Sequence, residues 1–549
     1  MNRSSLFTRL ALYAILILGS LAFAFPFIWM VSTSLKLDKE LFRGQIDIMP
    51  EQPNPRAKSP YYDARQYEYV ELQQPQFSTL APLLNDRVAA ASLPPGANTQ
   101  EVPDLIVAGL FENLHKRAPA SIWNGDPATL VRYATAEVTP ARIGEVAQNA
   151  YRGLGIGSLR ARNADLQEQE LATSAAPAQR WQNATPDVAT LTNSADNSLP
   201  FAAVAYDFSD RDRFVLQNTF DLPFSAADVH RLQLRVRPDD TWHELAFTLE
   251  SAGVQYAAAR PVSLADTRWM TVTWQKPGAD DHSTKIKTWI VMNPVAAGPQ
   301  FDHGANRIRV TLAFQKLTPM QAGFSKARYN FQRVLDQIPF WRYVRVSILL
   351  VILNVVLTLF SSSLVAYAFA RLQWPGRDIA FLVMLGTMMI PGQVTMIPHF
   401  LIWKTVGAYN TLTPLFAGAA FGNAFFIFLM RQFLKGIPPD LEDAARIDGC
   451  GFLRIYWHVM LPLVKPSLAA IAIFTFMGTW NDFLGPLVYI ADQRLYPLAF
   501  GLYAFSVQVS SNPVLTMAAS LLMTVPVILV FFLTQRYFVQ GITLTGMKG

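Results

Sequence analysis

The residue types that most often carry out chemistry are scarce in this 549-residue sequence and do not stand at the spacings that enzymes use. The one cysteine, Cys450, allows no internal disulfide and no cysteine-based metal site. His303, His399 and His458 stand far apart and show no ligand spacing. The sequence also lacks the Gly-x-x-x-x-Gly-Lys-Ser/Thr pattern, whose backbone amides cradle the phosphates of ATP. We therefore expect no catalytic residue, no metal site and no cofactor bound by this chain.

One polar loop between two apolar stretches is the most specific feature of the sequence. Residues 437–466 read IPPDLEDAARIDGCGFLRIYWHVMLPLVKP. Two prolines end the preceding element, and Asp440 suits the N-cap of a new helix because its carboxylate can accept bonds from free backbone amides. Glu442 and Asp443 fall in the first turn, where negative charge suits the helix dipole. The pattern predicts that a short helix begins here.

Small residues shape the remainder of this loop. Ala444 and Ala445 permit the close approach of another surface, and Gly449 and Gly451 allow the sharp turn that ends the helix. A second helical stretch, FLRIYWHVML, then leads to Pro462 and into the next apolar run. We predict a short, rigid helix with a small-residue face, presented to the cytoplasm as a docking element.

This loop resembles the EAA loop of ABC-importer permeases, whose pattern is Glu-Ala-Ala, three residues, Gly, nine residues, Ile, one residue and Leu-Pro. Asp443-Ala444-Ala445 replace the opening triplet, Gly449 follows at the right spacing, and Val459-Met460-Leu461-Pro462 close the pattern. Both departures, Asp for Glu and Val for Ile, are conservative. Stretches such as TWNDFLGPL within about 1–36 and 326–549 are similar to the maltose-type, carbohydrate-uptake branch. The segment between them lies outside the resemblance.

The resemblance implies a permease subunit of a binding-protein-dependent ABC importer for an oligosaccharide or related sugar. The expected partners are an ABC ATPase dimer that uses ATP and Mg, a second permease subunit and an extracytoplasmic solute-binding protein. Whether the permease pairs with itself or with another chain stays open. The residues expected to couple to the ATPase are Glu442, Asp443, Ala444, Ala445, Gly449, Leu461 and Pro462.

Six apolar stretches could position this loop, because a helix needs roughly 20 mostly apolar residues to cross a bilayer. They lie between Arg9 and Lys36 and at about 344–371, 379–401, 412–430, 467–489 and 514–534. Only 16% of all residues are charged, below the roughly one quarter usual in soluble proteins. Lysine and arginine form no run or stripe, so we expect contact with membrane lipid and none with nucleic acid.

Lysine and arginine in the short loops predict the orientation of the six spans. Most of them fall on the side of the N-terminus, including Arg371, Arg377, Arg431, Lys435 and Lys548. The interpretation is a multi-pass protein of the bacterial inner membrane with both termini in the cytoplasm. The loop at 437–466 then faces the cytoplasm, and residues 37–325 lie in the periplasm.

Polar side chains inside the spans are candidates for the solute pathway, because burying them in a bilayer is costly. Asn354, Asn423, Asn481 and Asp482 are these candidates, and Gln393 is a further polar residue inside a span. Hydrogen bonding between helices is an equally good explanation for Asn423. Asp482 also fits the outer membrane interface.

The segment 37–325 changes from apolar runs to ordinary globular sequence. Residues 49–100 are rich in proline and read as linker, and about 101–180 show helical periodicity. Between about 200 and 320, some eight short runs of period two predict strands and a β-sandwich. The fold class is therefore an α-helical polytopic membrane protein with an inserted, mixed, mainly β-sandwich domain, and 326–549 form the permease core.

Four tryptophans accompany the predicted strands: Trp242, Trp269, Trp274 and Trp289. We favour core and interface positions over a sugar-stacking surface. Trp269 and Trp274 stand an odd number of residues apart, so they should point to opposite faces of a strand. Two alternatives remain for the whole chain. One is a permease for a polyol, glycerol phosphate or peptide, and the other is a membrane-anchored sensor or enzyme.

Overall fold

The computed structural model describes residues 6–41, 47–63, 65, 74–91, 101–165, 167–171, 176–196, 198–278, 287–509 and 512–543. Parts of the predicted linker and Lys548 lie outside these residues. The chain divides into two compact units. The membrane unit comprises residues 1–51, 283–287 and 328–549, and the insert unit comprises 52–282 and 288–327.

The membrane unit is helical, and four of its helical segments are long and apolar enough to cross a membrane. They lie in α1 (Leu6–Ser34), in α9 (Phe340–Arg371), in the segment of α12 (Thr413–Phe416) and α13 (Ala424–Lys435), and in α20 (Pro513–Thr543). Two further pairs pass the same test together but are sharply bent. By length and composition, the described residues therefore hold four candidate spans, or up to six if each bent pair is one span.

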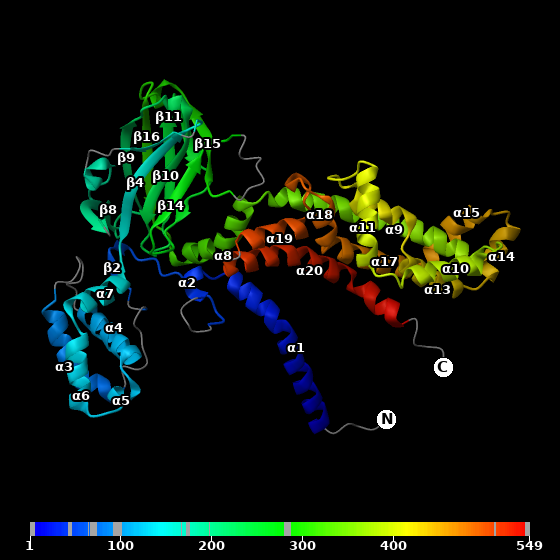
Figure 1. Ribbon diagram of the computed structural model, residues 1–549, viewed down its shortest axis with the longest axis horizontal. Helices are drawn as coiled ribbons and strands as arrows, with labels where there is room; N and C mark the ends of the chain where they lie inside the picture. The colour runs from blue at the N-terminus through cyan, green and yellow to red at the C-terminus, as the bar shows by residue number, and fades with distance from the viewer. Residues whose placement is uncertain are drawn as a thin grey trace. The chain divides into compact units, whose positions relative to one another are not determined.

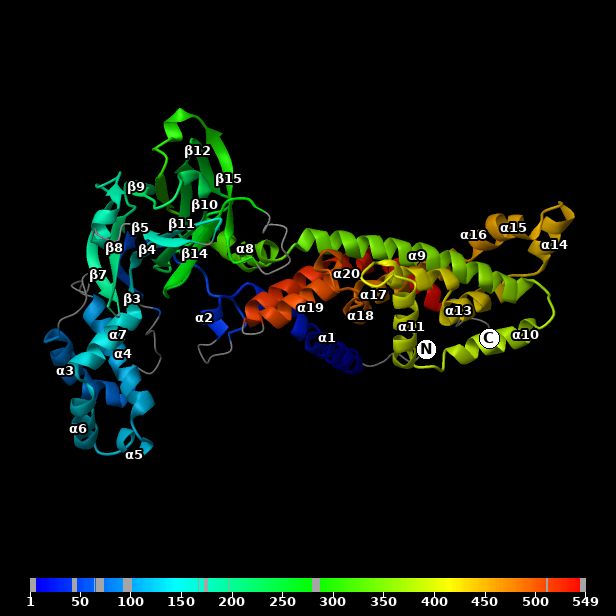
Figure 2. The ribbon, with the colours of Figure 1, turned by 45° about the horizontal axis from the view of Figure 1, so that its top comes forward.

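The bent pairs differ from the straight spans that the apolar pattern predicts. α10 (Arg377–Thr387) and α11 (Gly392–Thr405) meet at 98°, and the bend is visible in Figure 2. Pro391 explains this break, because proline lacks a donor and disfavours a helical conformation in the residue before it. The second pair joins Phe452–Leu463 to α17 (Lys465–Trp480) at 80°. The prediction of one helix over 467–489 is also wrong, because α17 ends at Trp480 and α18 (Leu484–Tyr489) is separate.

The long helix α9 organises the membrane unit (Figure 1). It packs against α13, α17 and α19 (Leu498–Gln508), and α20 packs against α1, α17 and α19. Buried residues form one cluster around Tyr367, Met430 and Tyr456, and another around Tyr343 and Trp480. The first cluster supports the end of the unit that carries the loop at 437–466.

After two short strands at 58–59 and 61–62, the described residues of the insert unit form five helices that share their own apolar core. They are α3 (Pro75–Ala89), α4 (Glu101–Arg117), α5 (Ala120–Trp123), α6 (Pro127–Glu137) and α7 (Pro140–Ala150). Two boundaries differ from the sequence interpretation. α3 lies in the stretch expected to be linker, and the helices end at Ala150 although helical periodicity was expected to about 180. The strands that follow these helices begin at Tyr151, where the glycines of YRGLGIGS disfavour a helix.

The remainder of the insert unit is one continuous sheet of 14 strands, with a separate pair formed by β2 (Tyr61–Tyr62) and β3 (Tyr151–Arg152). Its principal order is β1-β8-β4-β10-β14-β15-β12-β11-β16-β9-β6. The strands of the sheet are β1 (Lys58–Ser59), β4 (Leu154–Asn163), β5 (Glu168–Leu171), β6 (Gln182–Asn183), β7 (Ala189–Asp196), β8 (Leu199–Asp207), β9 (Arg213–Asp221), β10 (Val229–Arg237), β11 (Glu244–Ser251), β12 (Val254–Ala258), β13 (Val262–Ser263), β14 (Met270–Gln275), β15 (Ile290–Ala297) and β16 (Arg307–Gln315).

The predicted alternation is present in these strands. Along β10 and β16, alternate residues are buried, and one core cluster draws on strands from β4 to β16. The strands outnumber the expected eight and begin well before residue 200. A short parallel pairing of β14 with β15 joins the two antiparallel parts of the sheet. The sandwich itself stays a prediction.

Two of the four tryptophans, Trp242 and Trp274, lie in the core as expected. Trp274 is fully buried, and its ring stacks on Phe247 with centroids 4.0 Å apart. Trp242 is also buried. Trp269 is only partly buried and packs edge to face against Phe201, outside the core cluster that contains Trp274. The prediction that Trp269 and Trp274 point to opposite faces is confirmed.

Candidate functional site

The loop at 437–466 contains the predicted short helix, α14 (Asp440–Ile447). Its first turn carries Asp440, Glu442 and Asp443 as expected. The prediction that Asp440 is the N-cap is wrong. Pro439 takes that position, with its carbonyl accepting bonds from the amides of Glu442 and Asp443 at 2.9 and 3.0 Å. Pro439 already has helical angles, φ −66° and ψ −25°, so the helix starts one residue earlier.

Gly449 ends α14 as the sequence predicts. Its φ of +78° lies in the left-handed region that favours glycine. The amide of Gly449 donates to the carbonyl of Arg446, and the amide of Cys450 donates to the carbonyl of Ala445, both at 3.0 Å. These bonds close the end of the helix. Gly451 has a different role, since its φ is −73° and it is the N-cap of α15 (Phe452–Ile455).

Glu442 points into the protein and not toward solvent. Its side chain is 6% exposed. One carboxylate oxygen accepts a bond from the Arg446 guanidinium at 2.8 Å, and the other lies 3.8 Å from Nε of Arg371 on α9. Arg371 also donates to the carbonyls of Leu434 and Ile437, at 2.6 and 2.5 Å. Arg371 therefore ties α9 to the end of α13 and to the first turn of α14.

Sequence reasoning missed Arg371 as part of the site. It ends an apolar run, where any basic residue fits the distribution of charge in short loops. Only the fold brings it to Glu442. The sequence held one sign that this glutamate has a role in the site: Glu442 directly precedes the Asp443-Ala444-Ala445 triplet.

Much of the remaining loop is exposed, and its exposed residues include large apolar side chains beside charged ones such as Arg446 and Arg454. We call the following exposed residues the loop face: Leu441, Asp443, Ala444, Ile447, Phe452, Leu453, Trp457, Pro462 and Leu463. Ile447 is 86% exposed, whereas Ala445 is partly buried against the core of the membrane unit. Leu461 is also half-buried. An exposed apolar patch of this kind indicates an interaction surface.

Two of the predicted pathway asparagines hold backbone groups in place. Nδ2 of Asn354 donates to the carbonyls of Leu350 and Leu415, both at 3.0 Å, which fastens α9 to α12. Oδ1 of Asn423 accepts the amides of Phe425 and Phe426 and so caps α13. The preceding Gly422, with φ +82°, makes the break that this cap requires.

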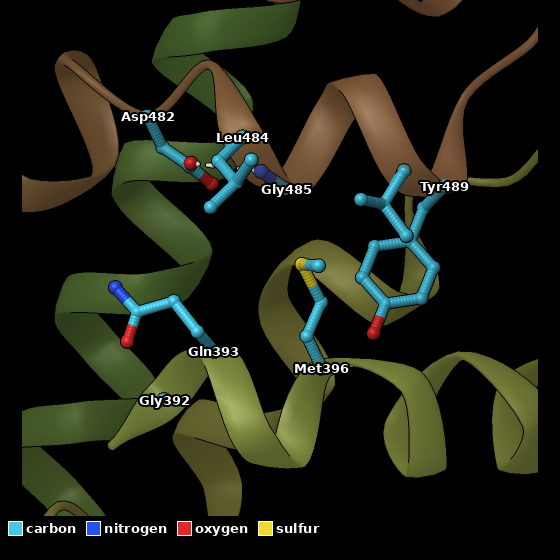
Figure 3. Close-up of a pocket in the computed structure, with 8 residues that line it drawn as sticks. Gly392, Gln393, Met396, Asp482, Leu484, Gly485 and Tyr489 are labelled. Carbon is cyan, nitrogen blue, oxygen red and sulfur yellow. Dashed lines mark hydrogen bonds between the residues drawn. The ribbon is translucent and has the colours of Figure 1, made fainter.

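Asp482 lies in a cavity of about 370 Å³ between α11 and the connection from α17 to α18 (Figure 3). Gln393 and Met396 contribute from α11, and Tyr489 closes the other side. Oδ1 of Asp482 accepts the amide of Gly485 at 3.0 Å. Asn481 is exposed, and its side chain donates to the carbonyl of Met477.

Gly485 is a residue of this cavity that sequence reasoning missed. A Cβ at this position would come within 2.5 Å of Oδ2 of Asp482 and 3.2 Å of Leu415. Glycine therefore lets the carboxylate fold back against the chain. The cavity thus offers an acid, an amide and a phenol among apolar walls, a combination that can bind hydroxyl groups.

Comparison with known proteins gives a consistent result. Residues 359–544 match the family described as "Binding-protein-dependent transport system inner membrane component". The arabinooligosaccharides transport system permease protein AraQ of Halalkalibacterium halodurans is 38% identical over 210 residues, which are 38% of this chain and 75% of that protein. The diacetylchitobiose uptake system permease protein NgcG of Streptomyces coelicolor is 35% identical over 198 residues, 36% of this chain and 66% of NgcG.

Solved structures are less similar as whole chains. A bacterial ABC transporter involved in the import of the acidic polysaccharide alginate is 29% identical, with a TM-score of 0.35, over 38% of this chain and 79% of that chain. The family match lies within the membrane unit and includes the loop at 437–466. The chain belongs to the binding-protein-dependent transport system inner membrane components, as a multi-pass permease of the carbohydrate-uptake type.

Proposed function

We propose that this permease carries an oligosaccharide or a related neutral sugar across the bacterial inner membrane, driven by a separate ATPase. The proposal that this chain couples to an ATPase rests on the loop at 437–466. There, Glu442 is buried against the protein while the loop face is exposed. The names of the relatives, which include arabinooligosaccharide, lactose and α-glucoside permeases, support the sugar part.

The loop face is the surface on which one subunit of an ABC ATPase dimer docks. ATP and Mg bind to that partner, and this chain binds no cofactor. When the dimer closes, it displaces α14. Because Glu442 and Arg371 link α14 to α9, the displacement is passed to the longest helix of the membrane unit. ATP can shift the transporter only by binding its two states with different affinity.

We infer that the chain crosses the membrane six times, with both termini in the cytoplasm and the insert unit in the periplasm, and the distribution of lysine and arginine over the short loops supports this orientation. A second permease subunit completes the pathway, and a solute-binding protein delivers the sugar from outside. The insert unit, with one apolar core among its helices and another in its sheet, guides that delivery protein. The Asp482 cavity lies on the solute pathway, where the carboxylate and Gln393 bind sugar hydroxyls.

Reconstitution of the complete complex in liposomes tests this proposal. ATP-dependent uptake of labelled lactose, maltotriose and arabinotriose is measured with the cognate binding protein outside. Ala444→Trp enlarges the loop face, so we expect it to abolish uptake and uptake-linked ATP hydrolysis. Asp440→Asn, in the same helix, is the control and retains both.

Asp482→Asn tests the pathway separately. We expect a higher sugar concentration for half-maximal uptake, with the ATPase still stimulated by the binding protein. Uptake of a polyol, glycerol phosphate or peptide, with none of any sugar, would overturn the proposed substrate class and leave the coupling intact. Uptake at the parental rate by Ala444→Trp would overturn the docking surface.

A further inference from the structure

Two cavities of about 390 and 380 Å³ lie side by side in the insert unit. They share four lining residues: Gln148 and Tyr151 at the end of the helical part, Asp196 at the end of β7 and Arg237 at the end of β10. We call the pair the Tyr151 cleft. Each cavity alone falls in the size range of small-molecule sites, roughly 300–1,000 Å³.

Small residues hollow the floor of this cleft. Ala203 and Ala205 line it from β8, while their neighbours Ala202 and Val204 face the buried core. Ala203 pairs with Gly155 on β4. Glycine inside a strand weakens the sheet, and one reason for its presence is the close approach of another group. Here a Cβ at Gly155 would come within 3.0 Å of the Trp269 ring.

The wall of the cleft is a rigid group of rings and guanidinium groups. Phe201 meets Trp269 edge to face at 5.1 Å, and Nε1 of Trp269 donates to Asp196 at 2.6 Å. The guanidinium of Arg235 lies 4.2 Å from the centre of the Trp269 ring. Arg237 lies 4.9 Å from the Phe201 ring and donates to the carbonyl of Gly153 at 3.3 Å. Trp269 lines the first cavity, and Tyr151 and Phe201 are the rings that line the second.

The charges of the lining are compensated within the protein. Arg237 lies 3.9 Å from Asp196, and Arg268 lies 2.9 Å from Asp266.

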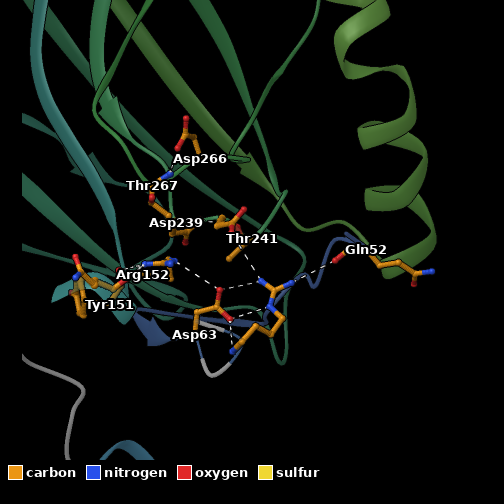
Figure 4. Close-up of polar contacts among 11 residues, drawn as sticks. Gln52, Asp63, Tyr151, Arg152, Asp239, Thr241, Asp266 and Thr267 are labelled. Atoms are coloured by element: carbon orange, nitrogen blue, oxygen red, sulfur yellow. Dashed lines mark hydrogen bonds and ion pairs between the residues drawn. The ribbon is translucent and has the colours of Figure 1, made fainter. Parts of the chain in front are cut away.

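Arg152 lies 4.0 Å from Asp63 (Figure 4). Burial alone would raise the pKa of Asp63, but the hydrogen bond from Arg65 and the charges of Arg65 and Arg152 bring that pKa below its ordinary value. The Asp63 carboxylate is therefore ionised at neutral pH and balances Arg152. The cleft presents fixed donors and acceptors without a large excess of positive charge.

We infer that the Tyr151 cleft binds a neutral saccharide. Aromatic rings can cover the apolar faces of a sugar ring, while side-chain amides, hydroxyls and paired guanidinium groups bind its hydroxyls. Thr192 and Ser194, which pair with Ala203 and Phe201, add hydroxyl groups along β7. The choice of ligand rests on the proposed function, because the cleft would hold the transported class of sugar outside the membrane.

Binding to the full chain in lipid nanodiscs, without the ATPase or binding protein, tests the inference. Lactose, maltotriose and arabinotriose are titrated by calorimetry, with trigalacturonate as the charged probe. We expect at least one neutral sugar to bind, and Ala203→Leu, which fills the floor, to weaken that binding about tenfold or more, equivalent to about 1.4 kcal/mol. Ala246→Leu, an exposed strand position on β11, is the matched control and leaves binding unchanged.

The Asp482 cavity of the membrane unit is another place where a sugar could bind, so the test includes a variant of that cavity. Sugar binding that is lost in Asp482→Asn and retained in Ala203→Leu would overturn the inference. So would binding of trigalacturonate alone, which would indicate an anion site. A thermal midpoint of Ala203→Leu equal to that of the parent chain shows that the variant is folded. If a second variant is needed, Tyr151→Ala opens the wall and is expected to weaken binding in the same way.

The outcome is separable from the proposed function. Sugar uptake by the complete complex without sugar binding by the full chain would overturn the cleft alone. Sugar binding by the cleft without uptake of any sugar by the complex would overturn the proposed transport substrate alone.

Discussion

Replacing Glu442 by glutamine should uncouple the permease through loss of a buried charge. The change keeps the shape of the side chain and removes the partner of Arg371, whose side chain is only 10% exposed. Removing one member of a buried ion pair lowers the free energy of unfolding by about 3–5 kcal/mol. The Arg446 pair, in which the arginine is 55% exposed, adds less than about 1 kcal/mol. Arg371 keeps two carbonyl acceptors, so we expect the lower end, about 3 kcal/mol in total.

The assay compares Glu442→Gln with Asp443→Asn, the same chemical change one residue later on the exposed side of α14. We measure the thermal midpoint of each permease in detergent, and the ATP hydrolysed per sugar imported by the reconstituted complex. Glu442→Gln should lower the midpoint and raise the ATP used per sugar. Asp443→Asn should leave the midpoint unchanged.

Equal midpoints and equal coupling for Glu442→Gln and the parent chain would refute the link from α14 to α9. A double charge reversal, Glu442→Arg with Asp443→Arg, tests the same helix. Such a variant should abolish transport, but the buried position means that Glu442→Arg acts by disrupting the loop and not only by opposing the helix dipole. The single substitutions separate these effects.

Three further predictions concern particular backbone and buried groups. Gly449→Ala places a side chain at φ +78°, so it should lower the free energy of unfolding by roughly 1–2 kcal/mol and reduce uptake. Gly451→Ala, at φ −73°, should change neither. Uptake assays and thermal midpoints of both variants check this. Asn354→Leu removes the bond to the Leu415 carbonyl and should lower the thermal midpoint by an amount equivalent to roughly 1–3 kcal/mol, and an unchanged midpoint would contradict it. Burial lowers the pKa of Lys276 to about 8, below the 10.5 of a free lysine. Below pH 8 the buried lysine is charged, and the loss of its hydration lowers the free energy of unfolding. As pH rises from 8 to 10.5, the native state loses this proton before the unfolded chain does, so the protein becomes more stable. Lys276→Met should therefore stabilise the insert unit by up to about 3 kcal/mol at pH 7, and a pH series of thermal midpoints should show this advantage shrinking above pH 8.

Local sequence was sufficient for the features that depend on neighbouring residues. The positive φ at Gly449 and the acidic first turn of α14 follow from residue types within one or two helical turns. The apolar length of α9 likewise decides that it can cross a membrane. The alternation in β10 predicts a strand with one buried face. Such properties need no knowledge of distant parts of the chain.

The ends of helices inside apolar stretches were harder to predict, because a hydropathy average is the same for one straight helix and for two helices that meet at an angle. Residues 379–401 carry no Asp, Glu, Lys or Arg, yet Pro391 separates two helices that meet at 98°. The end of α17 at Trp480 is equally invisible to composition. In the insert unit, helix propensity failed after Ala150, where pairing of β4 with β8 and β10 decides the conformation.

The sequence by itself determined that the chain is a membrane permease with a short helix in the loop at 437–466. Only the tertiary structure decided what the polar residues do. It turned Glu442 inward to Arg371, 71 positions earlier in the numbering, and brought Gln393 to Asp482 from another helix. It also assembled the Tyr151 cleft from α7, β7, β8 and β10. The reason is physical: a buried charge or amide is positioned by whichever partner the packing brings within hydrogen-bonding distance, and the sequence pattern around it does not name that partner.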